Sequence, residues 1–345
     1  MAMFALTVET DNIYSISISY WSQIMERKPF LQLLAQLESL THLQKQKLLS
    51  QINENSEKKS VSLIESSFND AKFCPHCQSF EISRWGKSHD LQRFRCKNCK
   101  KTFNALTGTS LSRLRYKELW LQYSQCLHDG ETVRKAAEVC GIDNTTSFRW
   151  RHRFLNRSTE NKQAKMTGIV EADETFFTES SKGNRRITER KARKRGKSAK
   201  KLKGERVPVL IVRDRSGTVA DFVFNELSKK EVHDSLRPLM DKEVVLCSDG
   251  NSFYQTFAKQ ENIPHKRIIS LDKEYVVDKI FHIQNLNAYI SRLKSWMIRF
   301  NGVATKYLSN YLAWRKVLES KDGENVNEYI KQCILRKSDQ HLTQT

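Results

Sequence analysis

The sequence predicts an α/β protein whose C-terminal half alternates strands and helices and follows a small cysteine-rich module and a helical segment. Three observations support this class. Two C-x-x-C pairs lie in the N-terminal third, apolar periodicity indicates short helices over about 110–160, and strand patterns alternate with helical ones from Gly168 onward. At 345 residues the chain can hold two or three domains and the core of an enzyme.

Four cysteines form two pairs, Cys74-Pro-His-Cys77 and Cys96-Lys-Asn-Cys99. Each pair can bind one metal ion through two thiolates, and together they complete the tetrahedral four-sulfur shell that suits Zn²⁺. Such a site is structural, so residues 72–105 are expected to form the two hairpins of a zinc ribbon. Disulfides are the weaker interpretation, because residues 1–24 contain no Lys or Arg and no compact apolar core of a secretory signal. The remaining cysteines have no pairing pattern and are expected to be buried free thiols: Cys126, Cys140, Cys247 and Cys333.

The formal charge of +20 indicates a polyanionic partner. Nucleic acid is the first candidate and an anionic membrane surface the second. The longest purely apolar run, Val207–Val212, is far too short for a membrane span, so we expect a cytoplasmic protein with no membrane partner. Half of the surplus charge is concentrated between Glu179 and Arg206, where thirteen Lys or Arg residues accompany three Glu residues.

Residues 1–70 are expected to be a helical extension and a linker. Leucines and an isoleucine recur at helical spacing between Phe30 and Ile52, which predicts a helix or a helical hairpin. Core packing explains these residues better than a dimerisation zipper, because the heptad pattern does not persist. The polar residues 53–70 are interpreted as the linker, and residues 318–345 as a C-terminal tail without a readable signal.

Residues 110–160 have the layout of a helix-turn-helix. A short helix is predicted at Thr132–Val139, Gly141 provides the turn, and Asn144 or Thr145 can cap the next helix. An ordinary helical hairpin is the alternative for this pattern. Beside the cysteine pairs and the positive charge, DNA binding is favoured, with the second helix in the major groove. Its candidate contacts to bases or phosphates are Arg149, Arg151 and Arg153.

From Gly168 the pattern predicts strands at Gly168–Phe177, Val207–Val212, Thr218–Phe224, Val244–Cys247 and Arg267–Ser270. Helices are predicted at Ser228–Met240, Ser252–Gln260 and Ile283–Phe300.

Two aspartates, Asp173 and Asp249, are expected at the ends of predicted strands. A rigid sheet fixes such a side chain while the strand end opens to solvent, which suits a metal ligand. A single aspartate of this kind is more often a turn former or a helix cap, but two in one layout strengthen the case. Mg²⁺ needs few protein carboxylates, because water and phosphate oxygens complete its octahedron.

Several short motifs lie around these aspartates: Glu171-Ala-Asp-Glu-Thr175, Val207-Pro-Val-Leu210, Ser248-Asp-Gly250, Glu274-Tyr-Val276, His282-Ile-Gln-Asn-Leu-Asn287 and Ser291-Arg-Leu-Lys294. With them, residues 168–317 resemble the catalytic domain of bacterial insertion-sequence transposases of the DDE kind. The cysteine module and the helical segment resemble the N-terminal part of the group that carries a zinc ribbon. The resemblance implies an RNase H-like, mixed-sheet catalytic domain and covers about residues 72–317.

The resemblance also implies site residues. Asp173 and Asp249 match the first two catalytic aspartates, the third acidic position falls on Asn287, and the lysine seven residues later falls on Lys294. Seven residues are nearly two helical turns, so Asn287 and Lys294 share a helix face, about 10 Å apart along the axis. Lys294 is then a DNA-phosphate contact, and a solvated helix charge is its alternative. Asn287 departs from the usual Glu and replaces a charged ligand with a neutral carbonyl oxygen.

The basic tract between the first strand and the hairpin is expected to lie on DNA. Its named candidates are Arg193, Lys194, Arg195, Lys200 and Lys201. Each phosphate neutralised releases a counterion, which makes such binding steeply dependent on salt. A disordered, solvated insertion is the alternative.

The implied function is transposition of an insertion sequence. The protein would bind the double-stranded ends of its element and target DNA, and catalyse cleavage and strand transfer with two divalent ions, Mg²⁺ or Mn²⁺. Since two ends must meet, a homo-oligomer on DNA is expected. The first alternative is a transposase-derived DNA-binding protein that no longer cuts, which Asn287 favours. The second, a nuclease for structured nucleic acid, fits the ribbon and helix-turn-helix less well.

Overall fold

A computed structural model describes residues 27–69, 72–156, 165–184, 186, 206–269 and 275–319. The chain divides into two compact units, residues 1–57 and 58–345, and each is described by itself. In the first unit, α2 (Arg27–Ser39) and the start of α3 (His42–Asn69) confirm the expected helices. Leu33, Leu49 and Ile52 are exposed there, which corrects the expectation that these residues pack in a core.

The linker expected at 53–70 is corrected by α3, which remains helical to Asn69. Ile64 and Phe68 are spaced four residues apart, so they share one helix face, and both are buried in the core of the second unit. Packing of this single face stabilises a helical segment whose other residues are mostly polar. The polar composition therefore concealed a helix held by tertiary contacts.

The cysteine-rich module forms the two hairpins that the sequence predicts. Its antiparallel sheet contains, in spatial order, β1 (Ile82–Ser88), β2 (Leu91–Cys96) and β3 (Thr102–Asn104). Phe68 of α3 packs against Phe94 and Phe103, with ring centroids 5.0 and 6.2 Å away. The small sheet thus takes much of its core from the preceding helix.

Four short helices follow: η1 (Lys117–Leu119), α4 (Trp120–His128), α5 (Val133–Cys140) and α6 (Asn144–Leu155). Gly141 ends α5 in the left-handed conformation, with φ of 62°, as the predicted turn requires. The expected cap of the next helix is corrected by one residue, because the Asp143 side chain accepts a hydrogen bond from the Thr145 amide.

The C-terminal half contains a five-stranded sheet in the order β6-β5-β4-β7-β8. β4 pairs with β7, and β7 with β8, in parallel, whereas β5 pairs antiparallel with both β4 and β6. The sheet is therefore mixed, and the α/β class is confirmed. Its strands are β4 (Ile169–Thr178), β5 (Arg206–Asp214), β6 (Val219–Val223), β7 (Val245–Ser248) and β8 (His265–Arg267).

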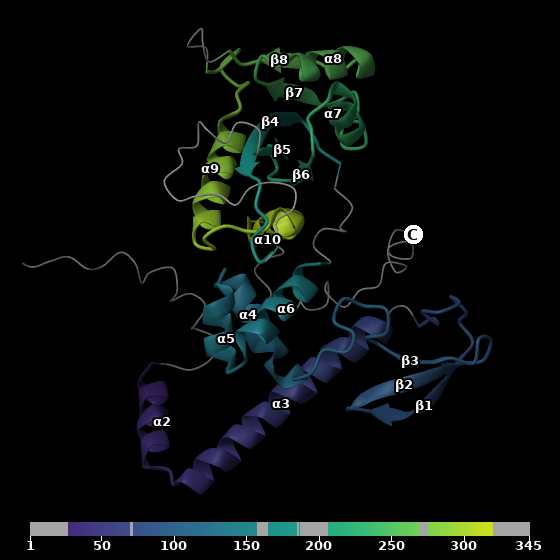
Figure 1. The fold of residues 1–345 in the computed structure, drawn as a ribbon, viewed down its shortest axis with the longest axis vertical. Coiled ribbons are helices and arrows are strands. Elements are labelled where there is room, and N and C mark those ends of the chain that lie inside the picture. Colours follow the sequence, from purple (N-terminus) through teal and green to yellow (C-terminus); the bar gives the residue numbers. More distant parts are fainter. Residues whose placement is uncertain are drawn as a thin grey trace, which may run out of the picture. The chain divides into compact units, whose positions relative to one another are not determined.

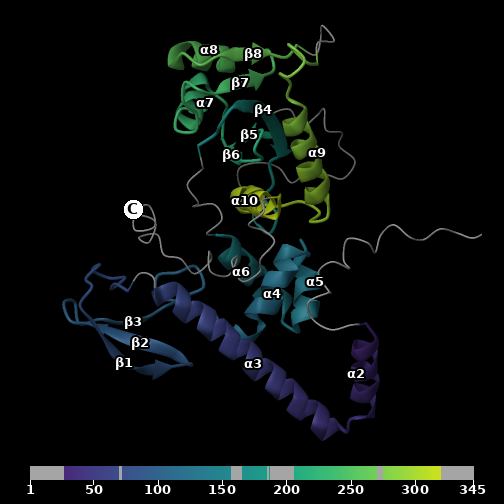
Figure 2. The same cartoon turned by 180° about the vertical axis from the view of Figure 1, so that it is seen from behind.

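Helices cover both faces of this sheet, and Figures 1 and 2 show α7 and α9 on opposite sides of it. Val170 and Ala172 of β4 pack in one cluster with residues of α7 and α8, while Val209 and Ile211 of β5 pack with residues of α9 and α10. The helices are α7 (Lys229–Leu236), α8 (Ser252–Glu261), α9 (Gln284–Ile298), η4 (Thr305–Tyr307) and α10 (Leu308–Glu319).

Two predicted bounds are corrected. The helix predicted to end at Met240 ends at Leu236, and the last strand lies at His265–Arg267 and not at Arg267–Ser270. A capping box formed by Ser228 and Glu231 begins α7.

The helical segment and the sheet domain share one hydrophobic core. The Trp314 indole of α10 donates a 2.9 Å hydrogen bond to the Leu127 carbonyl, and Arg299 donates one of 3.2 Å to Gly130. Trp120, Trp296 and Trp314 belong to the same buried cluster. In the parts of the chain that the structure describes, no helix is both long and apolar enough to cross a membrane.

Candidate active site and metal centres

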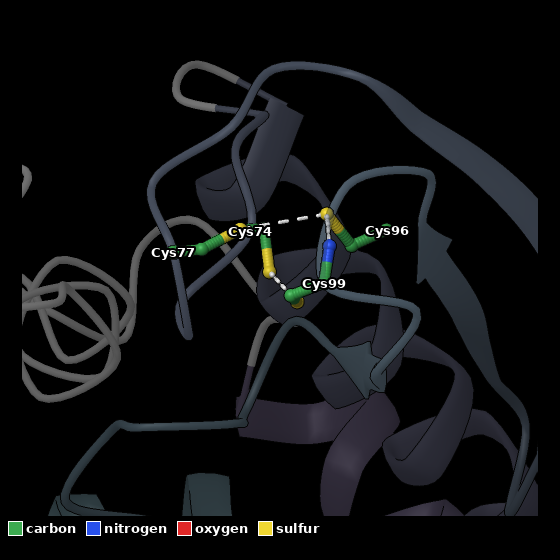
Figure 3. A group of neighbouring side chains, drawn as sticks. All are labelled: Cys74, Cys77, Cys96 and Cys99. Carbon is green, nitrogen blue, oxygen red and sulfur yellow. Dashed lines mark hydrogen bonds between the residues drawn. The ribbon is translucent and has the colours of Figure 1, made fainter.

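The four paired cysteines come together in the β1–β3 module (Figure 3). The Sγ atoms of Cys74 and Cys99 are 3.6 Å apart, and those of Cys77 and Cys96 are 3.5 Å apart. All four lie within 4.8 Å of one another. Four converging thiol groups fit a tetrahedral metal ion and leave no position for another ligand.

A second cluster consists of the carboxylates of Asp173, Glu174 and Asp249, whose oxygen atoms also lie within 4.8 Å of one another. Asp173 lies within β4 and not at its end, which corrects the expected position. Pairing of β4 with β7, however, ends at Ala172 and Ser248. Asp173 and Asp249 each follow that last pair, so the register places them side by side.

Burial shifts the acid–base behaviour of this cluster. It raises the pKa of Asp173 to about 6, where the Asp249 charge adds to the rise and the Glu174 amide and Lys294 oppose it. Burial likewise raises the pKa of Glu174 to about 7, and the neighbouring aspartates contribute to that rise. Holding several carboxylates together in a partly buried site is unfavourable unless a cation is bound among them.

Neighbouring side chains define the rest of the site. Asn251, which caps α8, donates a 3.3 Å hydrogen bond to the Glu174 carboxylate. Lys294 of α9 is exposed and lines a cleft of about 370 Å³ together with Glu174 and Arg206. The cleft therefore combines an acidic group with two cations that can bind phosphate.

A buried network joins β4 to the start of α9. The Glu171 carboxylate is 1% exposed and accepts a 2.8 Å hydrogen bond from the Leu286 amide in the first turn of α9. Arg215 lies 3.2 Å from the same carboxylate, and its guanidinium is 2.9 Å from the His282 ring. An anion at a helix N-terminus is electrostatically favourable, so Glu171 holds this end of α9.

Asn287 lies one residue beyond Leu286 and is exposed. Glu171 and Asp173 are two residues apart on β4, so their side chains share the sheet face that α9 covers. The structure thus places Asn287 on the helix anchored beside Asp173. Its side chain as a metal ligand stays a prediction.

The three arginines proposed for DNA binding differ in exposure. Arg149 is exposed on α6. Arg151 is fully buried, and its guanidinium lies over the Trp314 ring at 4.9 Å. Its side chain therefore offers no surface to a DNA groove. Arg153 donates hydrogen bonds to the carbonyl oxygens of Ser110 and Ser112. The basic-tract candidates lie outside the described residues: Arg193, Lys194, Arg195, Lys200 and Lys201.

Sequence reasoning did not single out Glu171 or Glu174. Both belong to the motif Glu171-Ala-Asp-Glu-Thr175, and adjacency to Asp173 was the available signal. The free thiols Cys126, Cys140 and Cys247 are buried, as expected, and Cys333 lies outside the described residues.

Comparison with known proteins relates these features to a family. Residues 165–316 match the family described as ISXO2-like transposase domain. The chain is also 24% identical over 291 residues to an uncharacterized protein in transposable element ISH50 of Halobacterium salinarum, an alignment that covers 81% of this chain and 97% of that protein.

Three solved structures of Mos1 transposase also match. The pre-cleavage transpososome has 12% identity and a TM-score of 0.25, covering 62% of this chain and 76% of that one. The paired-end complex has 12% identity and a TM-score of 0.24, and the match covers 57% of this chain and 74% of that one. The strand transfer complex has 13% identity and a TM-score of 0.22, and the match covers 60% of this chain and 76% of that one. Residues 165–316 of this chain are therefore similar to the ISXO2-like transposase domain.

Proposed function

We propose that the protein is the transposase of an insertion-sequence-type element and cuts and rejoins DNA by divalent-metal-dependent phosphoryl transfer. The observation that carries this proposal is the cluster of Asp173, Glu174 and Asp249 inside an ISXO2-like transposase domain. The relative in ISH50 supports the link to a transposable element. Its archaeal source gives no support to the bacterial origin expected from sequence.

Asp173 and Asp249 would hold the divalent ions, with Glu174 beside them and the Asn287 amide oxygen as a further ligand. Oxygen donors of this kind fit Mg²⁺ or Mn²⁺. When bound, such ions stabilise charge on the scissile phosphate and lower the pKa of the attacking hydroxyl group. Lys294 and Arg206 would orient the DNA by binding phosphates along the cleft.

The N-terminal modules would recognise DNA. We propose that Cys74, Cys77, Cys96 and Cys99 bind a structural Zn²⁺ and form a zinc ribbon. The helices α4–α6 would follow as a helix-turn-helix-like segment, in which exposed Arg149 contacts DNA. We further propose an RNase H-like fold for the sheet domain and a homo-oligomer that brings two element ends together.

Cleavage of a labelled duplex that carries the gene's own flanking DNA tests this function. With Mg²⁺ or Mn²⁺, we expect wild-type protein to nick one defined flanking position and Asp249→Ala to leave the duplex intact. Asp234→Ala is the matched control, because this aspartate is exposed on α7 and lies outside the cluster. It should cut like the wild type.

Specific binding without cutting by the wild-type protein would contradict the enzymatic proposal. It would support a DNA-binding protein derived from a transposase. That alternative is favoured by Asn287, which stands where the family resemblance leads one to expect a carboxylate.

A further inference from the structure

A second cleft, of about 700 Å³, lies between the N-terminal part of α6 and the segment that follows α9. We call it the α6 cleft. Its cationic lining residues are Arg134, Arg151, Lys182 and Arg299, and the described residues that line it include no Asp or Glu. Cations that line a cleft with low-dielectric walls concentrate a positive electrostatic potential inside it, and this potential favours an anionic ligand.

Arg151 provides a buried charge at this cleft. The residue is fully buried, and its Nη2 donates a 2.6 Å hydrogen bond to the Glu131 carbonyl oxygen. Its Nε and Nη1 atoms have no hydrogen-bond partner within the described structure. The guanidinium carbon lies 4.9 Å from the Trp314 ring centre and 5.9 Å from that of Phe300. Aromatic faces compensate a buried cation only in part, so a nearby anion would be stabilising.

An aromatic surface accompanies the charge. Phe148 is 43% exposed and makes edge contacts with His152 and Tyr307, with ring centroids 4.5 and 5.8 Å away. His152 and Tyr307 stack on each other at 3.7 Å, which fixes the position of Phe148. Burial lowers the pKa of His152 to about 4, and Arg151 and Lys306 add to this effect. The imidazole is therefore neutral near pH 7, and the cleft's charge comes from arginine and lysine.

We propose that the α6 cleft binds one unpaired nucleotide of a DNA strand, with its base stacked on Phe148 and its phosphate beside Arg134. Bases in a duplex stack on each other, so only an unpaired nucleotide offers a ring face to the protein. The cleft volume is within the range of small-ligand sites. That the strand is DNA rests on the proposed function, but the contact itself lies outside the acidic cluster.

The test measures binding of a short single-stranded oligodeoxynucleotide that contains 2-aminopurine, whose fluorescence decreases on stacking. Phe148→Leu keeps an apolar side chain but removes the aromatic face, and we expect affinity to fall about ten-fold. Arg134→Ala should weaken binding and reduce the slope of log affinity against log salt by about one. Lys135→Ala is the matched control, because Lys135 pairs with Glu138 and does not line the cleft. It should bind like the parent.

All variants are made in Asp249→Ala protein without added divalent metal, so the result does not depend on cleavage. Unchanged thermal midpoints show that each variant is folded. Equal affinity of the parent, Phe148→Leu and Arg134→Ala proteins would overturn the proposal. If the cleavage test fails but these variants lose binding as expected, only the proposed function is contradicted.

Discussion

Single residues of the acidic cluster control how the protein responds to pH. The pKa values of Asp173 and Glu174 are about 6 and about 7, whereas both groups titrate near pH 4 in an unfolded chain. Between these values the folded state binds more protons than the unfolded state. The contribution of these two groups to the stability of the metal-free protein therefore falls as pH rises from about 4 to about 7.

A divalent ion should reverse this loss, because it binds the ionised carboxylates. We expect the increase in melting temperature on adding Mn²⁺ to be small near pH 5 and largest above about pH 7. Calorimetric melting across this pH range measures it. Glu174→Gln removes the group whose pKa is about 7, so the half-maximal effect should move toward about pH 6, the pKa of Asp173. A Mn²⁺ effect that does not change with pH would contradict the assignment.

At the scale of elements, α9 is held at both ends by opposite charges. At the N-terminal end of α9, the Glu171 carboxylate accepts a hydrogen bond from the Leu286 amide. After its C-terminal end, the Lys182 ammonium donates to the carbonyl oxygens of Phe300, Asn301 and Gly302 at 3.1, 3.0 and 2.8 Å. Both arrangements match the helix dipole. Because α9 carries Asn287 and Lys294, these anchors set where both residues stand.

Replacement of Glu171 tests the N-terminal anchor. Glu171→Gln removes the charge that faces Arg215 and the Leu286 amide, and we expect a loss of about 2–3 kcal/mol in the free energy of unfolding. Urea denaturation measures the change. Glu226→Gln, at an exposed position, should alter stability by less than about 0.5 kcal/mol. Equal stability of the two variants would mean that Glu171 does not anchor α9.

Elements also show what sequence could predict. Apolar patterns predicted four of the five strands of the large sheet, whereas β8 begins two residues before the predicted strand. They also placed the start of α7 at Ser228, where a capping box with Glu231 forms. Strand alternation would separate Asp173 from Glu174, since neighbours face opposite sides. Their carboxylate oxygens still lie within 4.8 Å of one another, at the point where the pairing of β4 with β7 ends. Such convergence depends on the length of a neighbouring strand, which the local sequence does not reveal.

At the scale of the whole molecule, two centres of different chemistry are proposed. Thiolates suit Zn²⁺, whereas the carboxylates suit Mg²⁺ or Mn²⁺. The sheet domain also has a separate cluster of buried residues around Val170, Leu210 and Leu246, which contains no residue of the cysteine module. Loss of metal binding at the four cysteines should therefore leave this part of the sheet folded.

Cys96→Ser tests that independence. We expect zinc content to fall from about one ion per chain to none, because one of four thiolates is lost. Binding to element ends in a gel-shift titration should be lost, while a cooperative thermal transition of the sheet domain persists. His76→Ala is the control: this histidine lies between two cysteines but outside the four-sulfur cluster, so zinc should be retained. Undiminished end affinity in Cys96→Ser would remove the module from DNA recognition. Zinc loss in His76→Ala would instead replace the four-sulfur shell with one that includes imidazole.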